Sequence, residues 1–150
     1  MGAPPALPLS RQTFLEECPL SDMKEALYQA GLAARREILG DAWVEKSLKA
    51  RTEFTADFQD IITRNVWNEI WNRPGLDQKT RRLLVLAMTA SLGAWEEFRL
   101  HVRAGLEQNG FTESELQEVL LQIVVYAGAP GGNTAFSEAA KVISDIAVQS

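Results

Sequence analysis

The only histidine, His101, follows Glu97 by four positions, and this pair is the first feature of the chain that could do chemistry. Residues four apart on an α-helix share a face and lie within side-chain reach of each other. A carboxylate beside an imidazole can hold the ring in one tautomer and favour its protonated form near neutral pH. The same spacing is typical of a surface ion pair worth roughly a few tenths of a kcal/mol, so spacing alone leaves both interpretations open.

Basic residues gather around this pair. Between Arg64 and Arg103 the chain carries seven basic and four acidic residues, although the whole protein has a net charge of −5. An arginine-rich segment in an acidic protein suits a small anionic ligand, because guanidinium groups bind carboxylates through forked donors. Exposed helix arginines are the alternative interpretation. The negative net charge argues against nucleic-acid binding, which requires a basic face for phosphates.

The chain lacks the residues that metal binding and cysteine-based catalysis require. One histidine and one cysteine, Cys18, give no metal-ligand spacing, and Cys18 has no neighbouring base for nucleophilic catalysis. A single cysteine forms no intrachain disulfide, which fits a reducing compartment, and we expect a cytoplasmic protein. The longest apolar run, 83–94, is too short to cross a bilayer, so no membrane association is expected. Residues 1–20 are expected to form a flexible tail, because their prolines interrupt any apolar core of a signal peptide.

The pattern along the rest of the chain is helical, and no stretch alternates with period two for long enough to form a strand. Caps and breakers predict helices at about 22–39, 41–50, 54–71, 77–92, 94–108, 112–126 and 133–147. Asp22, Asp77 and Asn133 are expected to cap their helices, and Thr112 with Glu115 forms a capping box. The predicted fold is therefore all-α, a single-domain bundle of six to seven helices over residues 21–150.

Two of these helices, around 83–88 and 116–125, are apolar nearly all round. A domain of this size has room to enclose about one such helix, so the pattern favours an oligomer. The helix that carries His101 has a narrower apolar stripe. His101 and Glu97 lie roughly 100° from the centre of that stripe, at the flank where a side chain can line a crevice. The stripe consists of Trp95, Phe98, Val102 and Leu106.

Several stretches follow a recognisable pattern over about residues 24–145: 35–41, 58–64, 67–76, 80–81, 99–104, 118–122 and 126–130. The most specific is Trp-Asn-Glu-Ile-Trp-Asn-Arg-Pro-Gly-Leu at 67–76. With these residues the chain resembles the carboxymuconolactone decarboxylase family of the alkylhydroperoxidase-D-like superfamily, and its decarboxylase branch in particular. Redox-active relatives have two cysteines where this chain has Ala94 and Glu97, so no dithiol can cycle here.

The resemblance implies decarboxylation of 4-carboxymuconolactone to the enol-lactone of 3-oxoadipate, a step in protocatechuate catabolism, with neither cofactor nor metal. It implies a homo-oligomer, with a hexameric ring as the expected assembly, and catalytic roles for His101 and Glu97. Alternatives are a same-fold enzyme acting on another carboxylated lactone and a non-catalytic oligomeric binding protein. The expected substrate-binding residues are Arg81, Arg73, Trp67 and Trp71, with Arg64 and Arg99 as further candidates.

Overall fold

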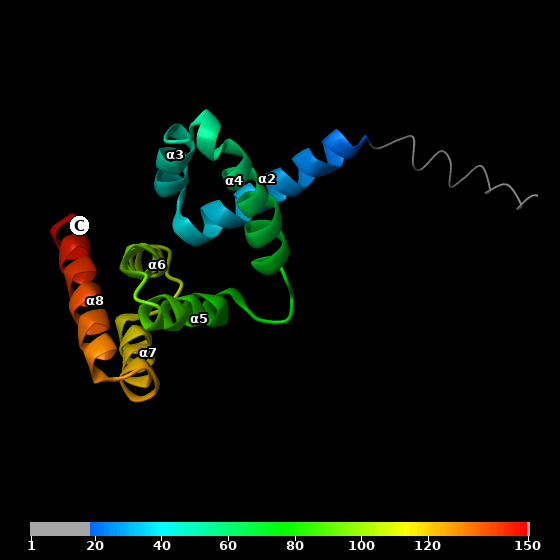
Figure 1. The fold of residues 1–150 in the computed structure, drawn as a ribbon. Coiled ribbons are helices and arrows are strands. Elements are labelled where there is room, and N and C mark those ends of the chain that lie inside the picture. Colours follow the sequence, from blue (N-terminus) through cyan, green and yellow to red (C-terminus); the bar gives the residue numbers. More distant parts are fainter. Residues whose placement is uncertain (1–18, 150) are drawn as a thin grey trace, which may run out of the picture.

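The computed structural model describes residues 19–149, which form seven α-helices and one π-helix and contain no strand (Figure 1). The predicted all-α fold is confirmed. Most of the predicted tail lies outside the described residues, and within the described part of the chain the helices begin at the tail's last residue, Leu20. The elements are α2 (Leu20–Leu39), α3 (Asp41–Lys49), α4 (Glu53–Ile62), η1 (Thr63–Ile70), α5 (Gln78–Ser91), α6 (Trp95–Glu107), α7 (Glu113–Tyr126) and α8 (Ala129–Gln149).

The helices pack around two buried clusters, and α6 contributes to both. Figure 1 shows α5 to α8 gathered together, with α2, α3 and α4 on the other side of α6. The N-terminal cluster consists of Ile38, Leu39, Val44, Trp67, Trp71 and Ala104. The C-terminal cluster consists of Leu86, Ala90, Phe98, Val102, Phe111, Leu116, Leu120, Ile123, Ala135, Ala139 and Val142. The helix that carries His101 therefore joins the two halves of the domain.

The sequence predicts one continuous helix over 54–71, but the structure divides this segment into α4 and the π-helix η1. The backbone N–H of Trp71 donates to the carbonyl oxygen of Val66, five residues earlier, at 3.2 Å. A π-helix changes which residues share a face. The 3.6-residue spacing of apolar side chains that is typical of an α-helix therefore does not identify the buried side of this segment. Several apolar residues of this segment are exposed, including Phe54 at 96% and Phe58 at 59% on α4, whereas Trp67 on η1 and Trp71 just after it are buried.

The crossing of α2 over η1 depends on Gly31. A Cβ atom at this position would overlap the backbone carbonyl of the buried residue Thr63, and a backbone obstacle cannot move aside as a flexible side chain can. Glycine alone permits this close approach. The tertiary contact with α2 therefore fixes the position of the π-helix, and with it the tryptophans that η1 carries.

Of the four predicted helix caps, two are confirmed and two are wrong. Asp77 accepts a hydrogen bond from the backbone N–H of Thr80 at 2.7 Å, and the capping box at Thr112 is formed. However, α2 begins before Asp22, without a side-chain cap. Helix α8 begins at Ala129 rather than after Asn133, because proline in a first turn lacks only an N–H that has no partner there.

The helices predicted to be apolar nearly all round keep exposed apolar edges. On α5 these residues include Leu92, which is 82% exposed, and on α7 they include Val125, which is 74% exposed. Among the described residues, no helix combines the length and the apolar character that a membrane crossing requires. The exposed edges comprise Leu84, Met88 and Leu92 on α5, and Leu121, Val125 and Tyr126 on α7.

Candidate active site

His101 lies on α6 at one end of a column of three aromatic rings. Its ring stacks on Trp71 with 6.3 Å between centroids and 5° between planes. Trp71 in turn stacks on Trp67 with 5.4 Å between centroids and 16° between planes. Both indoles are more than nine-tenths buried in the N-terminal cluster, whereas His101 is half-buried. We call these three residues the aromatic column, and His101 is the member that approaches the surface.

The imidazole of His101 is neutral at pH 7. Burial lowers the pKa of His101 from 6.5 to about 4, the positive charge of Arg82 lowers it further, and the charge of Glu97 opposes both effects. The Nδ1 atom is buried and has no hydrogen-bond partner among the described residues. A neutral imidazole carries one N–H donor and one acceptor nitrogen, so the ring retains the capacity to bind a polar atom of a ligand.

Glu97 and His101 lie four residues apart on α6, but no hydrogen bond or ion pair joins their side chains in the described part of the chain, and Glu97 is exposed. The ring packs against Trp71, where it is desolvated. The charge of Glu97 raises the pKa of His101, which is the expected direction. Burial and the charge of Arg82 outweigh this effect, so the pKa lies below its usual value.

Arg81 and Arg73 lie together at the start of α5. The Nη2 atom of Arg81 donates to the backbone carbonyl of Arg73 at 2.9 Å, which ties the loop after η1 to α5. The Nε atom of Arg81 is buried and has no partner within residues 19–149. The side chain of Arg73 is exposed and forms no hydrogen bond or ion pair with the described residues. Both guanidinium groups therefore keep donors available for an anion.

The two further arginine candidates are engaged elsewhere. Arg99 forms an ion pair with Glu138 of α8 at 2.6 Å, so its charge is already compensated. Arg64 lines a separate hollow of about 210 Å³ together with Arg51 and Asp60. No contact of either arginine with the aromatic column is present in the described structure.

Arg82 is a buried residue that the sequence analysis did not select. It is 4% exposed, and its Nη1 and Nη2 atoms donate to the backbone carbonyls of Ile38 at 2.8 Å and Glu37 at 3.3 Å. No carboxylate within residues 19–149 pairs with it. The available signal was its position one helical turn before the buried Leu86, which places Arg82 on the inner face of α5.

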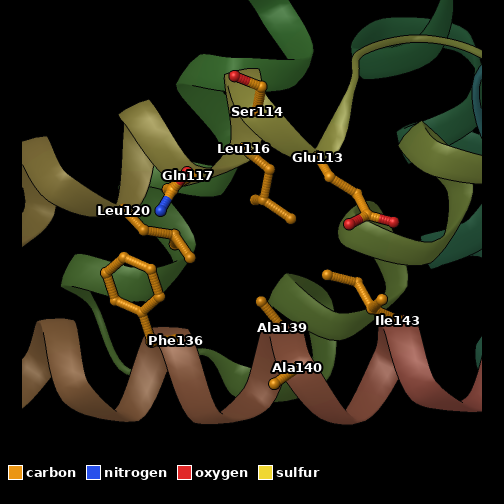
Figure 2. A pocket seen from close by; sticks show the side chains of 9 residues that line it. All are labelled: Glu113, Ser114, Leu116, Gln117, Leu120, Phe136, Ala139, Ala140 and Ile143. Atoms are coloured by element: carbon orange, nitrogen blue, oxygen red, sulfur yellow. The ribbon is translucent and has the colours of Figure 1, made fainter.

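A hollow of about 420 Å³ lies between α7 and α8 (Figure 2). Leu116, Leu120 and Phe136 line it, with Glu113 at its edge, so it is apolar and acidic and does not suit a dianion. None of the predicted catalytic or substrate-binding residues lines it. The described residues contain no group of three or more histidine, cysteine, aspartate or glutamate side chains that could hold a metal ion.

Fold and sequence together define a protein that is all-helical over the described residues and that has one cysteine, and therefore no cysteine pair for redox work. Residues 56–141 match the model of the carboxymuconolactone decarboxylase family, and the chain belongs to this family. The matched region runs from α4 into α8 and includes the aromatic column and both neighbouring arginines of the site.

Relatives along most of the chain are decarboxylases. The chain is 41% identical over 124 residues to 4-carboxymuconolactone decarboxylase of Acinetobacter baylyi, a match that covers 83% of this chain and 92% of that protein. It is 38% identical over 125 residues to nitrosuccinic acid decarboxylase of Metarhizium robertsii, covering 83% and 87%. A shorter match, 45% over 38 residues, is to 4-carboxymuconolactone decarboxylase of Pseudomonas putida. The predicted family and the predicted carboxy-lyase class are confirmed.

Proposed function

We propose that the protein removes CO2, without a cofactor, from a small dianionic acid whose resulting carbanion is delocalised onto oxygen, and that 4-carboxymuconolactone is its substrate. The observation that carries this proposal is the neutral, half-buried His101, whose buried Nδ1 atom has no partner among the described residues and whose ring stacks on Trp71, two residues before Arg73 in the chain. The two relatives that match most of the chain support the substrate class. Both 4-carboxymuconolactone and nitrosuccinate carry two carboxylates, one of them on a carbon whose electrons a lactone or a nitro group can accept.

The reaction begins when the bond between the ring carbon and the departing carboxylate breaks. CO2 leaves, and the electron pair remains on the ring carbon. This pair is conjugated through the C=C bond to the lactone carbonyl, so negative charge develops on the carbonyl oxygen of a furan-type enolate. A proton taken up from solvent then adds to carbon and gives the enol-lactone. The substrate itself accepts the electrons, which is why no cofactor is required.

His101 is assigned to the oxyanion. A neutral imidazole N–H can donate to the carbonyl oxygen as charge grows there, and a fixed donor of this kind strengthens in the transition state. A desolvated, stacked ring needs little reorganisation during the reaction, because Trp71 and Trp67 hold its plane. We therefore assign the two tryptophans to holding the imidazole ring in place, and not to binding the substrate as the sequence analysis expected. Glu97, which has no contact with the ring in the free protein, keeps a proposed electrostatic role only.

Arg81 and Arg73 are assigned to the carboxylates. The hydrogen bond from Arg81 to the Arg73 backbone holds the two residues together, and each guanidinium retains free donors. A planar fork binds a carboxylate through two parallel hydrogen bonds, and two such forks match the two carboxylates of the substrate.

The test is turnover of 4-carboxymuconolactone by His101→Ala, His101→Asn and the wild type, followed by CO2 release. We expect kcat to fall by about 10²–10³ in His101→Ala, as for loss of one oxyanion donor, and by less in His101→Asn, which keeps an N–H. Wild-type turnover by a folded His101→Ala protein would remove His101 from the mechanism. Nitrosuccinate is the second substrate of the assay, and a higher kcat/KM for it would reassign the substrate within the same class.

We propose further that the protein is a homo-oligomer, with a hexamer as the expected ring. The exposed apolar edges of α5 and α7 and the exposed Phe54 and Phe58 of α4 support this, because such a surface is unusual on a monomer. Light scattering measures the mass directly, and a monomer at micromolar concentration would contradict the proposal.

A further inference from the structure

Arg82 is fixed from two sides. Its guanidinium donates to the carbonyls of Ile38 and Glu37, the free carbonyl groups at the end of α2, where the helix dipole is negative. On the other side it lies against Gly110, in the turn after α6, where an added Cβ would overlap the Cδ and Nε atoms of Arg82. The cation is therefore held in one place without a neutralising carboxylate.

Packed residues connect Arg82 to the aromatic column. Ile38, whose carbonyl accepts the bond from Arg82, is fully buried in the same cluster as Trp71. Val85, one turn after Arg82 on α5, packs against that cluster as well. His101 stacks on the outer face of Trp71. Arg82 thus connects the end of α2 and the start of α5 to the wall on which the imidazole rests.

We propose that Arg82 is a positioning residue of the site: its guanidinium fixes the end of α2 against the stack of Trp71 and His101 and presents a permanent positive charge to the ring. This inference rests on the proposed function of His101 as a neutral donor. A cation close to an imidazole disfavours the imidazolium, so Arg82 keeps the ring in the form that the reaction uses.

The other charged groups around the ring do not replace Arg82. From η1 the ring meets the indoles of the column, and from α6 itself it feels the opposing charge of Glu97. Glu37 at the end of α2 acts on Arg82, whose pKa burial lowers and Glu37 raises. Three of the other charged residues of α6 are in ion pairs: Arg99 with Glu138 of α8, and Arg103 with Glu107 of α6 and Asp145 of α8.

The experiment is a pH titration of the imidazole by NMR in the full chain. Because the sequence contains one histidine, the imidazole signals of a tag-free sample belong to His101. The variants are Arg82→Gln, which keeps an amide donor for the Ile38 carbonyl, and Arg82→Lys, which keeps the charge. Arg103→Gln is the matched control, since it removes one positive charge from a paired arginine on the same helix as His101.

We expect the His101 midpoint near 4 in the wild type and in Arg103→Gln. In Arg82→Gln it should shift upward but stay below 6.5, because burial, the larger cause, remains. An unchanged midpoint in folded Arg82→Gln overturns the inference. If Arg82→Gln does not fold, the comparison is between Arg82→Lys, which keeps the charge, and Arg82→Met, which removes it: a higher midpoint in Arg82→Met than in Arg82→Lys supports the inference, and equal midpoints overturn it.

Kinetics separate this inference from the proposed function. The acid limb of kcat/KM reports the free enzyme, so it should move upward together with the NMR midpoint in Arg82→Gln. If the midpoint moves and the acid limb does not, Arg82 still acts on the ring, but the neutral ring is not what the reaction requires. The assignment of His101 then fails while the assignment of Arg82 stands.

Discussion

The titration of His101 should make its own contribution to destabilising this protein when the pH is lowered from 7 to about 4.5. The pKa of His101 is about 4 in the folded chain and 6.5 when the ring is free in solvent. The unfolded chain therefore takes up a proton first as the pH falls. The contribution of the neutral His101 ring to the free energy of unfolding is fully present above pH 6.5 and declines as the pH falls below that value. The decline ends once the pH is below the pKa of His101 in the folded chain.

The magnitude follows from the two pKa values. At pH 4.5 the unfolded ring is almost wholly protonated, whereas the folded ring remains largely neutral. The difference in proton-binding free energy between pH 7 and pH 4.5 is about 2 kcal/mol. That is a substantial part of the roughly 5–15 kcal/mol that holds an ordinary domain folded.

Urea unfolding at the two pH values measures this loss, with His101→Gln as the control. Carboxylates titrate in both proteins, so the loss in the wild type minus the loss in His101→Gln isolates the imidazole. Both proteins must be compared at one protomer concentration, because assembly also stabilises the fold. Equal losses in the two proteins would refute the assignment of a desolvated, neutral ring.

Three further predictions follow from the packing and from the arginine pair. Gly31→Ala should lower the unfolding free energy by about 1–3 kcal/mol, measured by denaturant titration, because the new methyl meets the backbone of Thr63; an unchanged midpoint would show that α2 and η1 can separate freely. Trp71→Ala should cost about 3–5 kcal/mol in the same assay and Trp71→Phe clearly less, since the stack on His101 survives in part. Arg81→Leu should raise KM for the dianion more than it lowers kcat or the melting temperature, and a folded variant with wild-type KM would contradict its carboxylate role.

Local signals predicted much of the fold. Thr112 and Asp77 begin their helices as expected, because a cap is formed by residues adjacent in sequence. The π-helix could not be predicted in this way. Its hydrogen bonds compete with those of an α-helix over the same residues, and the choice depends on the fit of α2 at Gly31, more than thirty residues earlier in the chain.

In the candidate site, too, the sequence predicted what depends on residues close together in the chain and missed what depends on residues from other elements. The half-buried position of His101 agrees with its place at the flank of the α6 stripe, whose Phe98 and Val102 are fully buried. Glu97 acts on the pKa of His101 in the predicted direction, but the net shift of this pKa is the opposite one. Glu97 is four residues away, whereas burial against Trp71 and the charge of Arg82 come from other elements, and sequence spacing contains no information about them.

The aromatic column also gives this protein spectroscopic signals that depend on the state of His101. Two indoles 5.4 Å apart and inclined by 16° couple their strong ultraviolet transitions, so the pair contributes an exciton signal to the far-ultraviolet circular dichroism. An imidazolium quenches tryptophan emission far more strongly than a neutral imidazole does, and the ring of His101 lies directly on Trp71. Emission from the native chain should therefore report, without any attached label, each change of charge on His101, including a change produced when a ligand arrives.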